Sequence, residues 1–299
     1  MNVRWRKSVV AAAVVALAVA VAPAGALKVY VSVDMEGISG VVHGSQVTED
    51  GRDFAAGRRW MAEDVNAVIA GLIEAGATEI VVNDSHGGMR NLLPDSLHPM
   101  ASLISGTPKP LAMMEGIDDS FDAVAFVGYH ATAGTARAIL DHTIAGRVVS
   151  RITVNGIEMP ELGLNAAIAG QFGVPVILVT GDTATAGQAR KLLGPNVVTV
   201  AVKEAIGRYA AHLLPMDEAR SRLEEGARRA LADRGAMAPY RLDPPYRFEV
   251  SFLTSAQAEM GALIPGVEWP EGRTLTFTAG RFTEGFTLLR ALIALGAGR

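Results

Sequence analysis

Four segments of the chain share one hydrophobic pattern, a run of apolar residues that ends abruptly in polar ones. They are Val29–Glu36 (VYVSVDME), Glu79–Gly88 (EIVVNDSHGG), Ala123–Ala131 (AVAFVGYHA) and Val174–Asp182 (VPVILVTGD). Short apolar runs rich in β-branched residues predict buried strands. Helical patterns lie between these runs, and this alternation favours a mostly parallel sheet covered by helices on both faces. The sequence therefore predicts an α/β fold.

Two of the intervening helices are well marked. Apolar residues recur at helical spacing from Trp60 to Ile73, and Gly76 is placed to end that helix. A second helix is predicted from Leu162 to Phe172, with Gly173 as its stop. In parallel sheets of this kind the ligand site lies beyond the carboxyl ends of the strands. All four polar strand endings fall there.

The pattern changes after about Pro195, where an α+β portion is predicted. Charge pairs at helical spacing indicate helices over 202–213 and 216–235, and alternation indicates strands over 246–253 and 273–279. A short helix is predicted over 255–263, and a last helix over 283–296 with Thr283 as its cap. The prolines between Gly235 and Pro245 predict a linker. We expect a catalytic α/β domain over 27–195 and a C-terminal α+β portion over 196–299.

The first 26 residues resemble a secretory signal peptide. Arg4, Arg6 and Lys7 form a basic start, an apolar run follows to Val21, and small residues precede Leu27. An uncleaved anchor is the alternative, but the apolar run is short for a membrane span. We expect cleavage after Ala26 and export to the periplasm or the medium.

Composition narrows the chemistry that the chain can use. The 299 residues include no cysteine, so disulfides, thiolate ligands and a thiol nucleophile are excluded. Any metal has to be held by carboxylate and imidazole. A net charge of −4 with scattered Lys and Arg gives no electrostatic footprint for nucleic acid.

The polar strand endings gather ligand-type residues. Asp34 and Glu36 alternate along an extended chain and so lie on one side of it, where two anions repel unless a cation separates them. Two of the six histidines, His86 and His130, follow other predicted strands. A single histidine at a strand end is more often a structural hydrogen-bonding group, but two facing an Asp-x-Glu pair favour Zn²⁺. Two Zn²⁺ sharing a bridging carboxylate would explain the crowded acids.

Six motifs, in order, resemble the dinuclear-zinc D-aminopeptidase family, the DppA-like peptidases. They run from about Leu27 to Asp182 and read SVDMEGISG, NDSHGGMRNL, ISGTPKPLAMMEGID, GYHA, DHT and ELGLNAAIAGQFGVPVILVTGD. The resemblance implies a zinc aminopeptidase that removes N-terminal D-amino-acid residues from short peptides, with two Zn²⁺ per chain, in a homo-oligomer. It implies these metal ligands, with Asp34 as the bridge: Asp34, Glu36, His86, His130 and Glu161.

The resemblance also implies that His142 is catalytic, as an acid/base group or as a nucleophile. Without it, His142 is a polar loop residue and Glu161 an acid favoured in the first turn of a helix. Asp84 and Asp182 are interpreted as turn residues, and Asn165 as a packing or substrate-contact position. The remaining histidines (His43, His98 and His212) are left unassigned.

Two other functions are open from the residues alone. A metal-dependent phosphoesterase would need cationic groups for phosphate, and no Lys or Arg stands at a predicted strand end. An exported binding protein without activity would be favoured by the loss of any of the five ligands, and all five are present. A signal peptide is a departure from the usual family pattern, which changes the location of the enzyme but not its chemistry.

Overall fold

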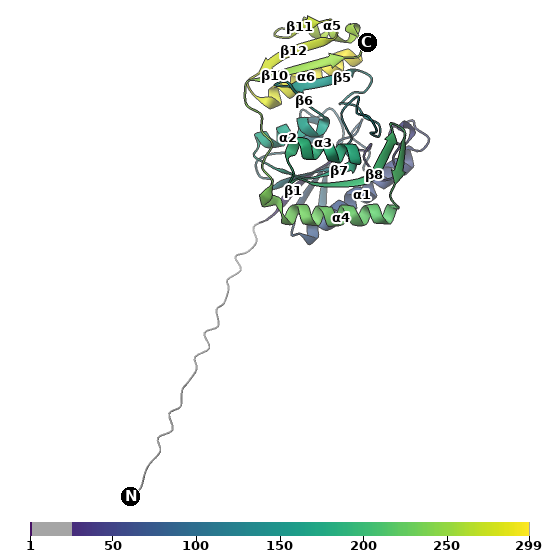
Figure 1. Ribbon diagram of the computed structural model, residues 1–299, viewed down its shortest axis with the longest axis vertical. Coiled ribbons are helices and arrows are strands. Elements are labelled where there is room, and N and C mark those ends of the chain that lie inside the picture. The colour runs from purple at the N-terminus through teal and green to yellow at the C-terminus, as the bar shows by residue number, and fades with distance from the viewer. Residues whose placement is uncertain (2–25, 299) are drawn as a thin grey trace.

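The computed structural model describes residue 1 and residues 26–298, and two β-sheets form its framework (Figure 1). Most of the predicted signal peptide lies outside these residues, so its cleavage stays a prediction. The first sheet has seven strands in the order β3 (Ala101–Ile104), β2 (Glu79–Asp84), β1 (Lys28–Val33), β4 (Ala123–Val127), β7 (Val176–Asp182), β8 (Val198–Gly207) and β9 (Ala210–Leu213). Every pairing in it is parallel except that of β8 with β9.

The second sheet has five strands and is antiparallel. Its order is β11 (Glu268–Glu271), β12 (Thr274–Ala279), β10 (Tyr246–Phe252), β5 (Val149–Val154) and β6 (Ile157–Glu158). The helices are α1 (Phe54–Glu74), α2 (Glu161–Gln171), α3 (Thr183–Leu193), α4 (Met216–Ala232), α5 (Ser255–Glu259) and α6 (Phe282–Ala297).

Helices cover both faces of the first sheet, which confirms the predicted α/β class. Val29, Val31 and Val33 of β1 join one buried cluster with residues of α1 and α4, while Tyr30 joins the other cluster with α2 and α6. Successive residues of a strand point to opposite faces, and this alternation places α1 and α4 on one side. In Figure 1, α1 and α4 lie below the sheet, α2 and α3 lie above it, and the second sheet lies beyond them.

One predicted helix is wrong. Residues 202–213 form the end of β8 and all of β9, not a helix. Val198, Val200 and Val202 alternate into the core, and β8 pairs with β7 as far as Lys203. Residues 203–213 then fold back as an antiparallel hairpin of β8 and β9, and this pairing outweighs the helical charge spacing. The result matters for the site, because β8 carries the buried Lys203.

The cap of the last helix is also wrong. Helix α6 begins at Phe282, its N-cap is Arg281, and no side chain caps it. Phe282 is fully buried and its ring lies 5.5 Å from that of Tyr246, so packing fixes this helix end in place of Thr283. The other predicted helices and strands of this portion are present, and residues 237–245 link α4 to β10 as the prolines indicate.

Sheet membership crosses the expected boundary near residue 195 in both directions. Strands β8 and β9 belong to the first sheet, whereas β5 and β6 belong to the second. The domain division at 195 stays a prediction. No helix in residues 26–298 combines the length and apolar character needed to cross a membrane.

Candidate metal centre

The loop after β1 is held against its neighbours by the backbone. The Asp34 amide donates to Val127 O (2.8 Å) and the Gly37 amide donates to Gly128 O (2.7 Å). A Cβ at Gly37 would lie 2.0 Å from Tyr129 O, so only glycine permits this close approach. Asp34 and Glu36 are thereby fixed at the carboxyl ends of the central strands.

The same loop rests on a buried cation that the sequence did not reveal. The Lys203 ammonium of β8 donates to the carbonyl oxygens of Glu36, Ile38 and Val41 at 2.6–2.8 Å. Burial lowers the pKa of Lys203 to about 7, although neighbouring acids, Asp182 foremost, act in the opposite direction. Lys203 is therefore a positioning residue for the Asp34–Glu36 segment. The wrong helix prediction for 202–213 concealed it.

The first ligand group consists of Asp34, Glu36 and His86. His86 Nδ1 lies 3.1 Å from Asp34 Oδ1 and 3.1 Å from Glu36 Oε2. Both carboxylates are at most 5% exposed. They follow β1 and His86 follows the adjacent β2, so neighbouring parallel strands deliver all three side chains to one edge of the sheet.

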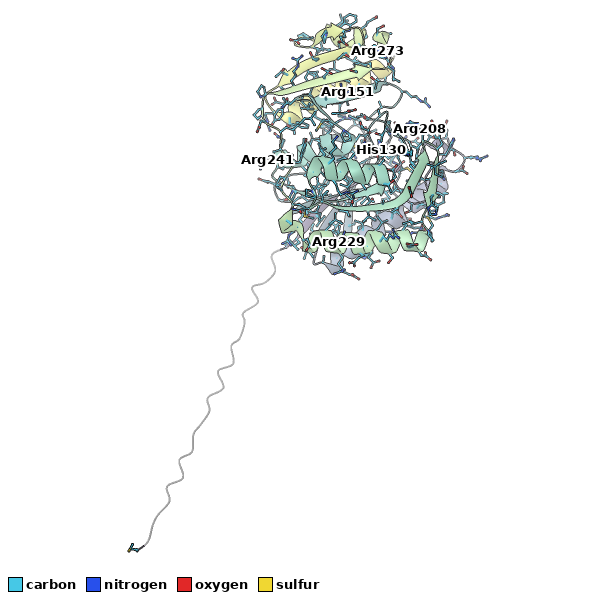
Figure 2. All side chains as sticks on the ribbon, in the orientation of Figure 1. His130, Arg151, Arg208, Arg229, Arg241 and Arg273 are labelled. Atoms are coloured by element: carbon cyan, nitrogen blue, oxygen red, sulfur yellow. The ribbon has the colours of Figure 1, made fainter. Side chains whose placement is uncertain are left out.

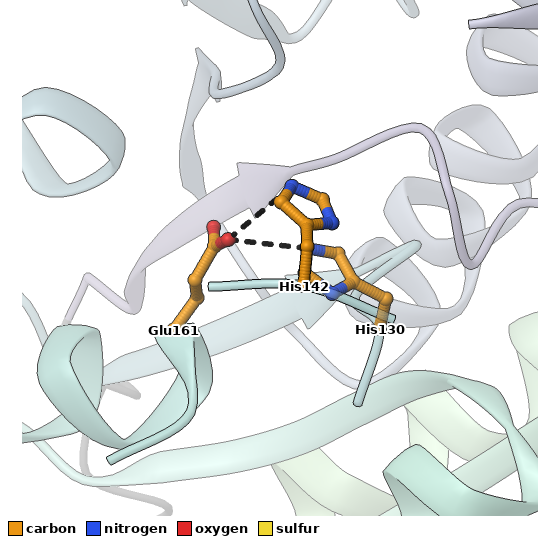
Figure 3. Close-up of side chains that lie close together, drawn as sticks. All are labelled: His130, His142 and Glu161. Carbon is orange, nitrogen blue, oxygen red and sulfur yellow. Dashed lines mark ion pairs between the residues drawn. The ribbon is translucent and has the colours of Figure 1, made fainter. Parts of the chain in front are cut away.

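The second ligand group consists of His130, His142 and Glu161. Glu161 Oε1 lies 3.2 Å from His130 Nε2 and 3.6 Å from His142 Nε2, and Figure 3 shows the carboxylate facing both imidazoles. The two rings stack with centroids 4.0 Å apart. In Figure 2, His130 lies inside the molecule, whereas Arg229 and Arg273 lie toward its outer parts.

Asp34 joins the two groups. Its Oδ1 faces His86, and its Oδ2 lies 3.4 Å from His130 Nε2. The two oxygens of one carboxylate therefore point toward different groups, as a bridging carboxylate requires. The structure brings together all six residues that were expected from the sequence.

Each histidine has one ring nitrogen committed to a backbone carbonyl. His86 Nε2 donates to Val47 O (2.7 Å), His130 Nδ1 to Ala131 O (3.0 Å) and His142 Nδ1 to Leu140 O (2.9 Å). A carbonyl can only accept, so these nitrogens carry the proton, and in the neutral ring the other nitrogen presents a lone pair. In all three rings that nitrogen faces a carboxylate. This arrangement is typical of histidines that ligate a metal.

The buried atoms of the site fit a cation. Glu36 Oε2 and His130 Nε2 are both inaccessible, and neither has a hydrogen-bond partner among the described residues. Native proteins rarely leave buried acceptors unpaired. A donor set of carboxylates and imidazoles without sulfur suits Zn²⁺. The residues therefore fit two metal ions, one in each group.

Burial and neighbouring charges shift the pKa values of several side chains in the site. Burial, followed by repulsion from Glu36, raises the pKa of Asp34 to about 7. Burial opposes the charged form of His130, but attraction to Glu161 prevails and raises its pKa to about 10. Burial and the neighbouring His130 lower the pKa of His142. Both effects favour the neutral form of His142.

The two aspartates interpreted as turn residues have structural partners. Asp84 accepts hydrogen bonds from the backbone of Asn91 and Leu92, and Asp182 caps α3 by accepting from the Thr185 amide (2.8 Å). Neither belongs to a ligand group in the described part of the chain.

Comparison with known proteins agrees with this geometry. A family model described as D-aminopeptidase matches residues 27–291. The D-aminopeptidase of Bacillus subtilis (strain 168) is 40% identical over 272 residues, which cover 90% of this chain and 97% of that protein.

The fold is similar to a solved structure over the same range. That structure is described as the "Zn-dependent D-aminopeptidase DppA from Bacillus subtilis, a self-compartmentalizing protease". It matches with a TM-score of 0.89 and 38% identity, over 91% of this chain and 99% of that one. The chain belongs to the D-aminopeptidase family.

Proposed function

We propose that this chain releases N-terminal D-amino-acid residues from short peptides or amides, at two Zn²⁺ held by five side chains. The observation that carries the proposal is the placement of Asp34, whose two carboxylate oxygens face separate ligand groups. Asp34, Glu36 and His86 would hold one ion, and Asp34, His130 and Glu161 the other. Family membership supports a D-aminopeptidase and counts against a phosphoesterase or a binding protein without activity.

Two Zn²⁺ would supply Lewis-acid polarisation of the scissile carbonyl and activation of water at neutral pH. The protein supplies the proton transfers. His142 keeps its Nδ1 proton on Leu140 O, so its Nε2 is free to take a proton from the attacking water and to deliver it to the leaving amine. Its lowered pKa suits the first of these steps. His142 therefore acts as a general base and then as a general acid.

Elemental analysis tests the proposal together with activity. Purified protein loaded with Zn²⁺ should contain two ions per chain and should hydrolyse D-aminoacyl amides in preference to their L-enantiomers. Active protein with at most one ion per chain would contradict the dinuclear site. Failure to hydrolyse either enantiomer would contradict the activity.

Assembly and location extend the proposal. The Bacillus subtilis structure is described as self-compartmentalizing, which supports a homo-oligomer for this chain as well. Light scattering coupled to gel filtration should give several times the 31.3 kDa of one chain.

The basic, apolar and small-residue order of the first 26 residues supports export. N-terminal sequencing from the native host should give Leu27, whereas a start at Met1 in the cytoplasm would contradict export.

A further inference from the structure

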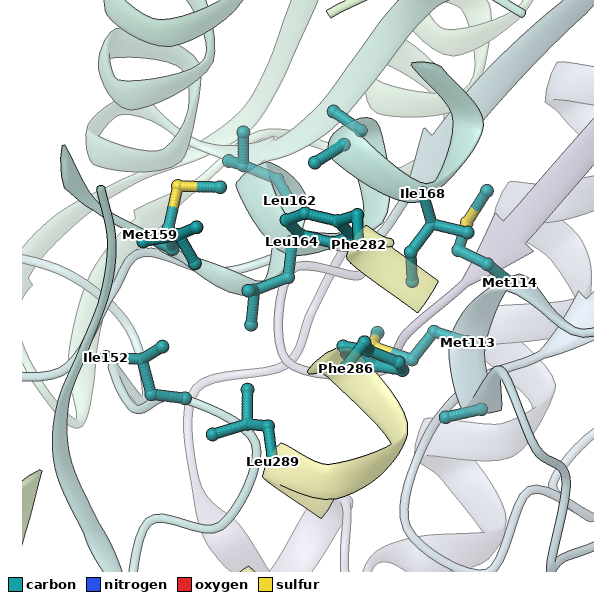
Figure 4. Packing of buried hydrophobic residues seen from close by; sticks show 14 of the residues in the cluster. Met113, Met114, Ile152, Met159, Leu162, Leu164, Ile168, Phe282, Phe286 and Leu289 are labelled. Atoms are coloured by element: carbon teal, nitrogen blue, oxygen red, sulfur yellow. The ribbon is translucent and has the colours of Figure 1, made fainter. Parts of the chain in front are cut away.

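A cavity of about 210 Å³ adjoins the second ligand group. Glu161 forms part of its wall, and Met113, Leu164 and Phe286 are among its apolar lining. Figure 4 shows these three residues near one another, on separate segments of the chain. The cavity therefore offers a mostly apolar chamber next to the carboxylate that would hold a metal.

Asn165 also lines this cavity. It follows Glu161 by four residues on α2, so the two side chains lie on the same face of the helix, one turn apart. Asn165 is 1% exposed. A carboxamide buried to this extent should have its donors and its acceptor satisfied.

The donor side of the Asn165 amide is satisfied. Its Nδ2 donates to the Tyr129 hydroxyl (2.9 Å) and to Met113 Sδ (3.2 Å). A thioether sulfur accepts but cannot donate, so the NH₂ group and not the oxygen must face it. This contact fixes the orientation of the amide.

A chain of hydroxyl groups supports the same orientation. Ser32 Oγ lies within hydrogen-bond distance of Met113 O (2.9 Å), Ser85 Oγ (2.7 Å) and the Tyr129 hydroxyl (2.7 Å). When its single proton is donated to Met113 O, the phenol is the donor in the bond with Tyr129. The Tyr129 oxygen is then left to accept from Asn165. Every donor in the chain points away from Asn165 Oδ1.

The acceptor side has no protein partner, because no described residue donates a hydrogen bond to Asn165 Oδ1. This oxygen is not among the fully inaccessible atoms that lack a partner, so it is open to a group in the cavity. We propose that Asn165 Oδ1 accepts a hydrogen bond from the free α-amino group of the substrate, and that the cavity encloses the N-terminal residue. This inference rests on the proposed function and names the residue that would distinguish an N-terminal residue from an internal one.

The dimensions of a peptide agree with this placement. The α-nitrogen lies about 2.5 Å from the carbonyl carbon, given the standard N–Cα and Cα–C bonds. A carbonyl placed beside Glu161 can therefore hold its amine within the same cavity, which Asn165 also lines. The side chain of the residue would contact Met113, Leu164 and Phe286. An acylated nitrogen would be bulkier and could not bring a positive charge to the acceptor.

Arg290 lines the cavity as well, and it provides the competing hypothesis. Its guanidinium donates to the carbonyl oxygens of Lys109 and Pro110, and no described acid lies within ion-pair distance of it. A substrate carboxylate could enter in place of the amine and bind there. The experiment has to separate these two orientations.

Two hydroxamates that differ only in the amine provide the test. D-Alanine hydroxamate and propionohydroxamate both chelate zinc, and calorimetry on the full Zn²⁺-loaded chain measures the affinity of each. Wild type should bind the amino compound about 10- to 100-fold more tightly, as expected for a hydrogen bond to a charged group. Asn165→Leu should abolish this preference. Asn165→Asp, which keeps an acceptor but loses the donors, should retain it.

Three results would overturn the inference. They are equal affinities in wild type, a preference that survives in Asn165→Leu, and a preference lost in Asn165→Asp as fully as in the leucine variant. The last would show that only the donor side of the amide matters. The affinities measured for wild type and for Asn165→Asp can each contradict the inference. The test therefore remains possible if the leucine variant fails to fold.

Controls separate this inference from the proposed function. Zinc content and activity on D-aminoacyl amides are measured on wild type, so they test the proposed function without any variant of Asn165. Succinic acid monohydroxamate tests the competing orientation. If it gains affinity that Arg290→Met removes, while the amino compound gains none, the cavity holds a carboxylate and the assignment of Asn165 is wrong.

Discussion

The two ligand groups are assembled in different ways. In the first, Asp34, Glu36 and His86 follow two adjacent strands of one sheet, so strand order alone brings them together. In the second, His130 follows β4, His142 lies in the long connection before β5, and Glu161 opens α2. The assembly of the second group therefore depends on the course of the loop between β4 and β5 and on the position of α2, as well as on the sheet.

The support of the two groups also differs. Buried charges hold the loop of the first group, because Lys203 donates to three of its carbonyls and Asp64 accepts from the Ser39 amide (2.8 Å). Backbone groups hold most of the second: two carbonyls fix its histidines, and the Ile144 amide donates to Glu161 (2.6 Å). Its supporting charge is the ion pair of Arg208 with Asp141 beside His142, in which the Arg208 side chain is 40% exposed and not buried like Lys203. The first group should therefore be the more sensitive to the loss of a supporting charge.

The largest effect is expected from Asp34→Ala, which removes the residue common to both groups. Both metals should be lost, and activity should fall to the background of the assay. Elemental analysis after dialysis measures the loss, and circular dichroism confirms that the fold remains. A variant that kept one full equivalent of zinc would show that Asp34 serves only one group.

The next largest effect is expected from His142→Ala. Both metals should remain, and turnover should fall by about 100- to 10,000-fold, as is usual for the loss of a general acid/base. The residual rate should rise for substrates with a good leaving group, such as an activated anilide, because these need little proton donation.

Two outcomes would change the role of His142. Loss of one zinc in His142→Ala would make it a ligand of the second group, which its 3.6 Å separation from Glu161 makes worth testing. An acyl group trapped on its imidazole and identified by mass spectrometry would make it the nucleophile.

A matched pair, Glu36→Gln and Glu161→Gln, tests whether the groups are separate. Each should leave about one tightly bound Zn²⁺. Removal of a ligand should weaken its own site by more than the 10- to 100-fold typical of an outer-shell partner. Zinc titration of each variant measures the two affinities. If both variants lost the same site, the division into two groups would be wrong.

The fold was predicted where the local pattern is strong. The four strand endings and helices α1 and α2 follow from apolar runs and helical spacing, whereas α3 was not predicted. The prediction for 202–213 failed because the segment continues a strand that pairs with β7 and then folds back on itself as a hairpin. The prediction for Thr283 failed because the burial of Phe282 depends on distant residues. Strand β5 was missed for the same reason, since its partner β10 lies about a hundred residues further along the chain.

The candidate site shows the same division. Asp34, Glu36, His86 and His130 could be selected from strand endings alone. His142 and Glu161 needed the family resemblance, because a loop histidine and a first-turn acid are common in any protein. Lys203 was not selected from the sequence. The alternating valines before it do predict a strand, and recognising that strand would have placed Lys203 near the carboxyl ends of the sheet. Asn165 was interpreted as a packing or substrate-contact position, and the sequence did not decide between the two.

A smaller effect is expected from Lys203→Met, which keeps the length of the side chain and removes its charge. Buried carbonyls of the Asp34–Val41 loop would lose their donor, at a cost of about 2–4 kcal/mol in the free energy of unfolding. Zinc affinity should fall more in the first group than in the second. Thermal unfolding and zinc titration measure both effects. Lys191→Met, at an exposed position of α3, is the control and should change neither.

The smallest effect concerns Asp64, the acidic partner of the same loop. Burial raises the pKa of Asp64 to about 6 from 3.8, while hydrogen bonds from Ser39 and the cations Arg220 and Lys203 act in the opposite direction. A raised pKa means that the folded state binds the proton more tightly than the unfolded state. This contribution to stability is present at low pH and is lost as the pH rises through about 6.

Asp64→Asn removes this titration while it keeps an oxygen for the Ser39 amide. Between pH 5 and pH 7, wild type should therefore lose stability relative to the variant by about 1 kcal/mol. Denaturant unfolding of both zinc-loaded proteins across this range measures the difference, and comparison of the two cancels the titration of groups that they share. A difference that stays constant with pH would show that Asp64 is already ionised at pH 5. The first group would then rest on a full ion network of Lys203, Asp64 and Arg220, and its contrast with the mostly backbone support of the second group would be sharper.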